Sequence, residues 1–152
     1  DALLGTSGCK NVLTIGEECF ADCRQLGTVS VGNKLTTLGN GCFSGCETLS
    51  SVHLSSLLPA IPDRCFYNCY ALSNVTVPMS VTRIGNMAFY NCIKLSILTF
   101  PGTGITSIAA DSFAGVPFSS LQVWYKATAD ASSYLETWLK APAQSAIQLH
   151  AI

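Results

Sequence analysis

The stretch that decides the fold is Pro78-Met-Ser-Val81-Thr-Arg-Ile84-Gly-Asn-Met-Ala88-Phe89-Tyr-Asn-Cys92-Ile-Lys-Leu95-Ser-Ile-Leu98-Thr-Phe100. Its apolar residues recur at the same relative positions in the segments before it, so the chain is built from copies of one unit. The copies are marked by phenylalanines at intervals of 23, 23, 23 and 24 residues, namely Phe20, Phe43, Phe66, Phe89 and Phe113. Such an array buries its core between neighbouring copies and leaves an extended surface for partners, which favours recognition over catalysis.

The period divides the chain into three parts. Five repeats are expected at 9–31, 32–54, 55–77, 78–100 and 101–123, after a remnant of a preceding repeat at 1–8. Residues 124–152 fall outside the period and are predicted to form a C-terminal cap, with a helix over 133–140 and a last strand over 146–151.

The fifth repeat contains two changes of length. One residue is gained before Phe113 and one is lost after it, so Leu121 and Val123 are expected to stand where Leu98 and Phe100 stand in the fourth repeat. A slip of one residue would turn the apolar side of a strand toward water, so this compensation indicates that the alternation is under physical constraint.

Each repeat combines a strand signal with a tight turn. The final residues of 72–77 alternate between apolar and polar, which indicates a strand. Cys42, Phe43 and Cys46 have the spacing i, i+1 and i+4 of a short helical or 3₁₀ turn. We therefore predict an α/β solenoid that has a parallel sheet on one face, short helical turns on the other, and a C-terminal helical cap.

The segment 80–101 reads S-V-T-R-I-G-N-M-A-F-Y-N-C-I-K-L-S-I-L-T-F-P and resembles the BspA-like leucine-rich repeat, whose unit runs S-V-T-x-I-G-x-x-A-F-x-x-C-x-x-L-x-x-V-x-I-P. The resemblance covers about residues 9–123 in five phased copies. It implies a leucine-rich-repeat (LRR) solenoid at the cell surface or secreted from the cell, and several members of the family are adhesins toward host or matrix proteins. Repeats one to three depart from the family by carrying cysteine where alanine usually precedes the phenylalanine.

Composition and charge argue against several functional classes. Charged residues make up only 11% of the chain and the net charge is -1, which gives no electrostatic basis for binding nucleic acid or an anionic membrane. No apolar run reaches the roughly 18 residues that a transmembrane helix needs. No phosphate-binding loop and no nucleophile, base and acid set is recognisable, so neither a cofactor nor an enzymatic activity is expected. The low charge also suggests end-to-end self-association.

Eight cysteines fall largely into two phased sets. Cys19, Cys42 and Cys65 share one repeat position, Cys23, Cys46, Cys69 and Cys92 share another, and Cys9 lies outside both. Within a pair, Cβ atoms at i and i+4 are about 5–6 Å apart, whereas a disulfide needs about 3.5–4.5 Å. Zinc would need further ligands, and the histidines number two, His53 and His150. We favour buried free thiols that fill the core, with disulfides between repeats as the open alternative and Cys9 as the most reactive thiol.

Partner binding is expected on the outward side of the sheet, because strand residues alternate between its two faces. The predicted outward residues are Thr28, Ser30, Ser51, His53, Asn74, Thr76, Ile97, Thr99, Ser120 and Gln122. This face is small, polar and uncharged, and Trp124 is expected instead to pack over the end of the stack. We predict a non-enzymatic protein-interaction module that mediates adhesion. The alternative is a structural spacer in a larger surface protein, and a thiol or metal-dependent enzyme is the least favoured interpretation.

Overall fold

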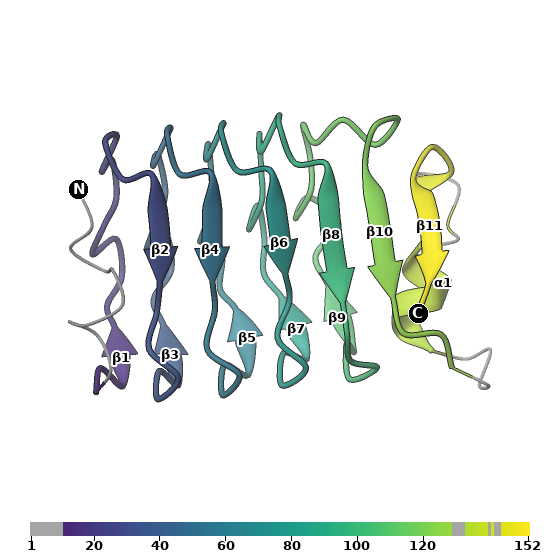
Figure 1. The fold of residues 1–152 in the computed structure, drawn as a ribbon, viewed down its shortest axis with the longest axis horizontal. Coiled ribbons are helices and arrows are strands. Elements are labelled where there is room, and N and C mark those ends of the chain that lie inside the picture. The colour runs from purple at the N-terminus through teal and green to yellow at the C-terminus, as the bar shows by residue number, and fades with distance from the viewer. Residues whose placement is uncertain (1–10, 129–132, 140, 142–143) are drawn as a thin grey trace.

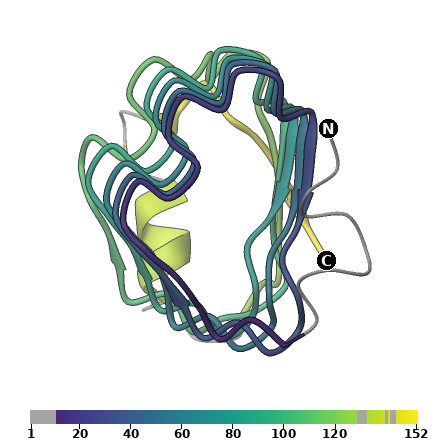
Figure 2. The same ribbon diagram turned by 90° about the vertical axis from the view of Figure 1, so that its left-hand side faces the viewer.

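The computed structural model describes residues 11–128, 133–139, 141 and 144–152. The chain winds into stacked coils whose outlines superimpose when they are viewed along the solenoid axis (Figure 2). Two rows of strands run along the solenoid, one in front of the other in Figure 1. The predicted remnant at 1–8 and Cys9 lie outside the described residues.

The larger row is a six-stranded sheet in which every pair of neighbours is parallel. In spatial order its strands are β11 (Gln148–Ala151), β10 (Gln122–Tyr125), β8 (Ile97–Phe100), β6 (Asn74–Thr76), β4 (Ser51–His53) and β2 (Thr28–Ser30). The central apolar residue of each strand from β2 to β10 is buried, as Val29, Val52, Val75, Leu98 and Val123. The predicted parallel sheet at the end of each repeat is therefore confirmed.

The smaller row consists of two-residue strands, one in each coil. They are β1 (Thr14–Ile15), β3 (Thr37–Leu38), β5 (Ala60–Ile61), β7 (Arg83–Ile84) and β9 (Ser107–Ile108). The second residue of each strand is an isoleucine or leucine that points into the core and is buried. This row is divided, because β1 pairs only with β3 while β5, β7 and β9 form a separate sheet.

The segment around each phenylalanine is a series of tight turns and does not form the predicted helical turn. In the third coil the N–H groups of Cys65, Tyr67 and Cys69 donate to the carbonyl three residues earlier. The N–H groups of Arg64, Phe66 and Asn68, which alternate with these donors along the chain, donate instead to backbone carbonyls of the next coil at 2.8–2.9 Å. Arg64 and Asn68 also adopt left-handed backbone angles, with φ of 54° and 56°, which no right-handed helix allows.

A left-handed residue recurs at one position of every turn. The residues at this position are Asp22, Gly45, Asn68, Asn91 and Gly115. Asn, Asp and Gly are the residue types that tolerate this conformation best. The side chains of Asn68 and Asn91 also join neighbouring coils, since the Asn91 amide nitrogen donates to the Asn68 Oδ1 at 3.1 Å.

We expect Gly45→Ala to destabilise the fold by more than about 1 kcal/mol, because alanine is strained at positive φ. Gly45 has φ +72°, and a Cβ atom there would collide with the Asp22 carboxylate. Gly27→Ala is the matched control, since a Cβ at Gly27 would meet no atom within 4 Å. Denaturant unfolding measures both variants. Equal midpoints for the two variants would contradict the left-handed turn.

The core is dominated by one continuous column of phenylalanine rings. Successive centroids, from Phe20 through Phe43, Phe66 and Phe89 to Phe113, lie 5.5, 5.7, 5.4 and 5.0 Å apart, and the ring planes differ by at most 17°. Offset-stacked rings at such separations add to the stabilisation that apolar burial already provides. The coils therefore lie in register, as the repeat period predicted.

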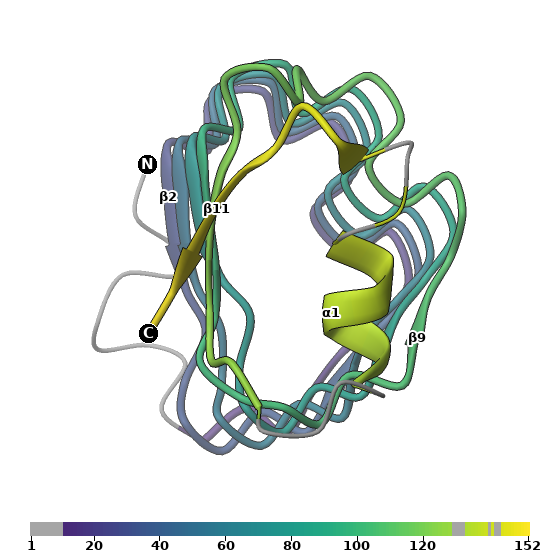
Figure 3. The same ribbon diagram turned by 90° about the vertical axis from the view of Figure 1, so that its right-hand side faces the viewer.

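The C-terminal end of the column meets the single helix that the described residues contain, α1 (Tyr134–Leu139). Figure 3 shows α1 lying across the opening of the last coil. Leu135 and Leu139 are buried, and the Trp138 ring lies 5.4 Å from that of Phe113. The helix falls within the predicted range 133–140, of which Lys140 lies outside the described residues.

The register of β10 differs from the prediction. Val123 pairs with Leu98 and Tyr125 with Phe100, so the strand is displaced by two residues from the expected alignment. The fifth coil gains a residue after Phe113, where the repeat pattern predicts the loss of one. Leu121 and Val123 are both buried, so a shift of two residues preserves the alternation of apolar side chains. Strand β11 lies within the predicted range 146–151 and continues the sheet.

Candidate functional site

The outward side chains of the six-stranded sheet form two rows, which we call the outer face. The first row contains Thr28, Ser51, Asn74, Ile97, Gln122 and Gln148, and the second contains Ser30, His53, Thr76, Thr99, Trp124 and His150. Nine of the ten predicted residues belong to these rows. Ser120 does not, because it precedes β10 and its hydroxyl donates to the Pro117 carbonyl at 3.1 Å.

The sequence interpretation missed three outer-face residues, Gln148, His150 and, the largest of them, Trp124. Trp124 pairs with Thr99 in the sheet, is 37% exposed, and stacks on the His150 ring with centroids 4.4 Å apart. The prediction that Trp124 packs over the end of the stack is therefore wrong. The available signal was the alternation that continues through Gln122-Val-Trp-Tyr125, since Val123 and Tyr125 are both buried.

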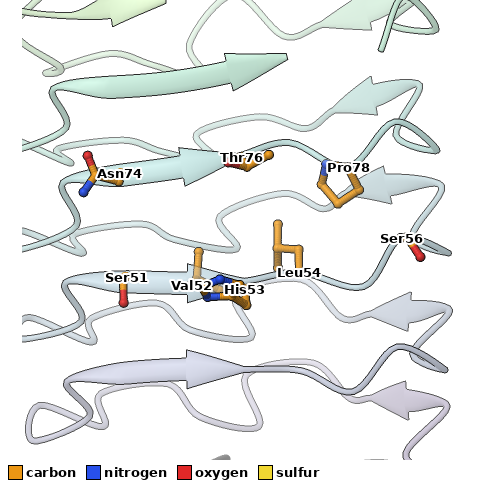
Figure 4. A pocket seen from close by; sticks show the side chains of 8 residues that line it. All are labelled: Ser51, Val52, His53, Leu54, Ser56, Asn74, Thr76 and Pro78. Atoms are coloured by element: carbon orange, nitrogen blue, oxygen red, sulfur yellow. The ribbon is translucent and has the colours of Figure 1, made fainter. Parts of the chain in front are cut away.

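A depression of about 530 Å³ lies on the outer face between β4 and β6. Figure 4 shows its lining, which comes from β4, β6 and the residues that follow these two strands and consists of Ser51, Val52, His53, Leu54, Ser56, Asn74, Thr76 and Pro78. Four of the predicted outer-face residues are among them. The volume falls within the roughly 300–1,000 Å³ that small-molecule sites occupy in proteins.

The depression lies where the sheet opens. Strands β4 and β6 are paired only at Ser51 and Asn74, whereas β2 and β4 on one side and β6 and β8 on the other are paired over three residues. The N–H of Val77 donates to the Thr99 carbonyl at 2.9 Å, but among the described residues Leu54 makes no equivalent bond to Thr76.

At this opening the side chain of Leu54 is less buried than its counterparts in the neighbouring coils. It is only partly buried, whereas the residues at the equivalent positions of the neighbouring coils, Val31 and Val77, are 3% and 1% exposed. The side chain of Leu54 therefore contributes apolar surface to the depression.

The same two coils are also separated in the smaller row of strands. In the other coils the N–H groups of Gly39 and Gly85 donate to the preceding coil at 2.8 and 2.9 Å. Pro62 occupies the equivalent position in the third coil, and Pro59 occupies the position of Thr36. Proline has no N–H to donate, so β3 and β5 do not pair. The boundary between the second and third coils is therefore the least hydrogen-bonded in the sheets.

The outer face contains few ionisable side chains. Its rows contain histidine but neither carboxylates nor lysine or arginine. The ion pair between Arg24 and Glu47, 3.4 Å apart, lies away from these rows and is exposed to solvent. A neutral or weakly polar partner therefore suits this surface better than a highly charged one.

The described cysteines only partly follow the prediction of buried thiols, because Cys19 and Cys23 in the first coil are exposed. All seven described cysteines are free, and five of them are buried. The thiols of Cys46, Cys69 and Cys92 each donate to a phenylalanine carbonyl of the preceding coil at 3.1–3.2 Å. Burial raises the pKa of Cys42 from 9.0 to about 12, which keeps this thiol protonated and unreactive at neutral pH. Interpretation as buried free thiols is thereby supported for the core positions.

Metal sites and membrane spans are both absent from the part of the chain that the structure describes. Histidine, cysteine and carboxylate side chains do not gather there in any group of three or more that a metal ion could use. Within the same ranges, no helix has both the length and the apolar character needed to cross a bilayer.

The stacked coils, the parallel sheet and the phased leucines and phenylalanines define an LRR solenoid. Residues 10–133 match the model of the BspA type leucine rich repeat region in six copies. The chain therefore belongs to the BspA-type LRR family, as the resemblance of its repeats indicated. A search of curated proteins finds no match to this sequence.

Several solved structures share the fold. The chain is 25% identical to a leucine rich cell surface protein of Faecalibacterium prausnitzii, with a TM-score of 0.73 over 78% of this chain and 31% of that one. It is 27% identical to a leucine-rich repeat protein of Bacteroides ovatus, with a TM-score of 0.67 over 74% of this chain and 28% of that one. The pneumococcal vaccine antigen PcpA, at 17% identity, shares the fold with a TM-score of 0.69 over 94% of this chain and 40% of that one. The chain thus spans less than half the length of each of these proteins.

Proposed function

We propose that this chain is a non-enzymatic interaction module of a cell-surface or secreted protein, and that it binds a protein partner through the outer face. The single observation that carries the proposal is the outer face itself, a continuous surface over six parallel strands that holds Trp124 and a depression. Membership of the BspA-type LRR family supports a role in protein interaction or in structure. Adhesion to host, matrix or neighbouring-cell proteins is the specific role that we propose.

The surface location is supported by one relative in particular. The structure from Faecalibacterium prausnitzii that shares this fold is described as a cell surface protein. We also propose that α1 acts as a helical cap that shields the last coil, which the burial of Leu135 and Leu139 supports. Solenoids need terminal caps of this kind because their end coils would otherwise expose apolar surface.

We expect Thr76→Arg and Thr99→Arg each to weaken binding to a matrix protein at least about tenfold, because each adds a bulky charge to a neutral interface. Both threonines lie in the second row of the outer face. The measurement is surface plasmon resonance against a panel of purified extracellular-matrix proteins. The matched control is Thr37→Arg, which adds the same charge to an exposed strand position of the smaller row.

The outcomes separate adhesion from the alternative role as a spacer. Loss of binding in Thr76→Arg and Thr99→Arg, with Thr37→Arg unaffected, supports the outer face as the adhesive surface. Equal binding by all three variants would contradict it. A wild-type protein that binds no member of the panel would favour a structural spacer, which the rigid phenylalanine column also suits.

A further inference from the structure

We propose that the depression between β4 and β6 is a subsite for neutral sugar units, so that the partner is recognised through an uncharged glycan. The inference rests on the proposed function, because it names the chemistry that the outer face recognises. It is carried by three features of the depression: free polar side chains on its rim, an apolar floor, and the lack of carboxylate, lysine and arginine side chains.

The polar side chains of the rim are not used by the fold. Among the described residues, the side chains of Ser51, His53, Ser56, Asn74 and Thr76 form no hydrogen bond with another residue. Serines one position earlier in the repeat behave differently. The hydroxyls of Ser50, Ser73 and Ser96 each donate to a backbone carbonyl of the preceding coil, at 3.0, 3.3 and 3.2 Å. The rim therefore keeps a set of donors and acceptors that a ligand can use.

The apolar floor of the depression and its lack of charged side chains indicate which class of ligand it can bind. Val52, Leu54 and Pro78 provide apolar surface beneath the polar rim. A sugar ring presents an apolar C–H face together with hydroxyl groups that both donate and accept hydrogen bonds, and it matches this combination. The lining contains neither lysine nor arginine to hold an anion and no carboxylate to hold a cation. A neutral saccharide therefore fits better than a phosphorylated or acidic ligand.

Trp124 provides a second contact for a ligand longer than one sugar. It lies on β10, two strands away from β6, which corresponds to about 10 Å across the sheet. Its indole ring is exposed and is held against His150, so its position on the outer face is fixed. Ring faces of aromatic residues pack against the C–H faces of sugars. A short oligosaccharide running across the strands can therefore occupy the depression and contact Trp124.

A peptide strand is a less suitable occupant for the same opening. Strands β4 and β6 still pair at Ser51 and Asn74, so the opening is closed at one end and no strand can insert between them. The opening is also a local departure from a regular array, and such departures are expected at functional sites.

The test is a titration of the ¹⁵N-labelled protein with cellotriose, mannotriose and N,N′,N″-triacetylchitotriose, followed by NMR. With at least one of them we expect saturable shifts of the backbone amides of residues 51–56 and 74–76, at millimolar affinity. Trigalacturonic acid, which carries negative charge, should cause no such shifts. Absence of saturable shifts with all three neutral trisaccharides, or shifts confined to other regions, would overturn the assignment.

Substitutions place the sugar in the depression. We expect Asn74→Ala and Thr76→Val each to weaken trisaccharide binding about fivefold, because each removes one hydrogen-bonding group. Trp124→Ala should weaken binding of the trisaccharide more than binding of the corresponding monosaccharide. The matched control, Thr37→Val in the smaller row, should leave the affinity unchanged. Equal affinities for Asn74→Ala, Thr76→Val and the control would exclude the depression as the site.

Two results distinguish failure of this inference from failure of the proposed function. Enzymatic removal of glycans from the bound matrix protein should abolish binding. If binding persists, and Thr76→Arg still weakens it, the outer face recognises polypeptide and the glycan assignment fails alone. If trisaccharides bind but Thr76→Arg does not affect the matrix protein, the adhesive function fails and the sugar subsite stands.

Discussion

Replacing Phe66 with alanine is expected to lower the free energy of unfolding by about 3–5 kcal/mol, which is the range for truncating a buried phenylalanine. Phe66 has no solvent-exposed surface and lies at the centre of the phenylalanine column, 5.7 Å from Phe43 and 5.4 Å from Phe89. Its removal leaves a cavity that both neighbouring coils line. Because solenoid stability includes an interface term for each pair of coils, the substitution weakens two such terms at once. Urea denaturation followed by circular dichroism measures the effect.

Tyr67→Ala is the control for this prediction, since Tyr67 is the next residue in the same turn. Its ring is only partly buried and stacks on a single partner, Tyr90, at 5.0 Å. We expect a loss of about 1 kcal/mol, which is typical of one aromatic pair. A loss in Phe66→Ala no greater than in Tyr67→Ala would show that the column does not form the core.

The stacking of the coils was predictable because it follows directly from the period. A side chain that recurs every 23 residues must return to the same place in every coil if the strands are in register. The period alone therefore places the residues of the phenylalanine column, the inward valines and the outward threonines correctly.

The turns and the last coil were less predictable, for two physical reasons. Spacing such as that of Cys42, Phe43 and Cys46 suits a helical turn and a series of tight turns equally well. The choice between them depends on hydrogen bonds to the next coil. In β10, Leu121 and Val123 are both apolar, so the period of two cannot fix the register. The predicted repeat ends at Val123, so the prediction assigns Trp124 to the cap, whereas β10 continues to Tyr125 and places Trp124 on the outer face.

The depression was partly encoded in the sequence. Pro59 and Pro62 replace residues whose N–H groups bond to the preceding coil elsewhere, so a weakened boundary between the second and third coils was foreseeable. The opening of β4 and β6 on the opposite side was not, because the residues of these strands keep the apolar and polar alternation of the neighbouring repeats. Among the described residues, the candidate sugar subsite thus lies at the coil boundary where both sheets lose pairing.

The folded protein is expected to become unstable between about pH 9 and pH 12. Burial raises the pKa of Cys42, Cys46 and Cys92 from 9.0 to about 12, and it also raises the pKa of Cys65 and Cys69. The unfolded chain therefore releases thiol protons above pH 9 that the folded chain retains. A state that binds fewer protons is favoured as the pH rises, so these thiols stabilise the fold fully below pH 9 and lose that contribution above it.

The expected size of this effect is large. At pH 10 each of the five thiols costs on the order of 1 kcal/mol relative to neutral pH, so together they cost several kcal/mol. That figure is comparable with the roughly 5–15 kcal/mol by which whole domains are stable. The loss of stability at pH 10 is set by the pKa of the thiols in the unfolded chain. It changes little with their pKa in the folded protein, provided that this folded pKa lies well above 10. Chemical denaturation at a series of pH values under reducing conditions measures it.

The double variant Cys42→Ala, Cys65→Ala isolates the thiols from other groups that titrate at high pH. Alanine suits this position, since Ala88 occupies it in the fourth coil and is fully buried. The two proteins share every other titratable group, so the loss of stability between pH 8 and pH 10 should be on the order of 2 kcal/mol smaller in the variant. An identical pH dependence in the two proteins would mean that Cys42 and Cys65 ionise as easily in the folded coils as in the unfolded chain. The thiols would then be accessible to solvent, and the tight stacking of the coils around them would be wrong.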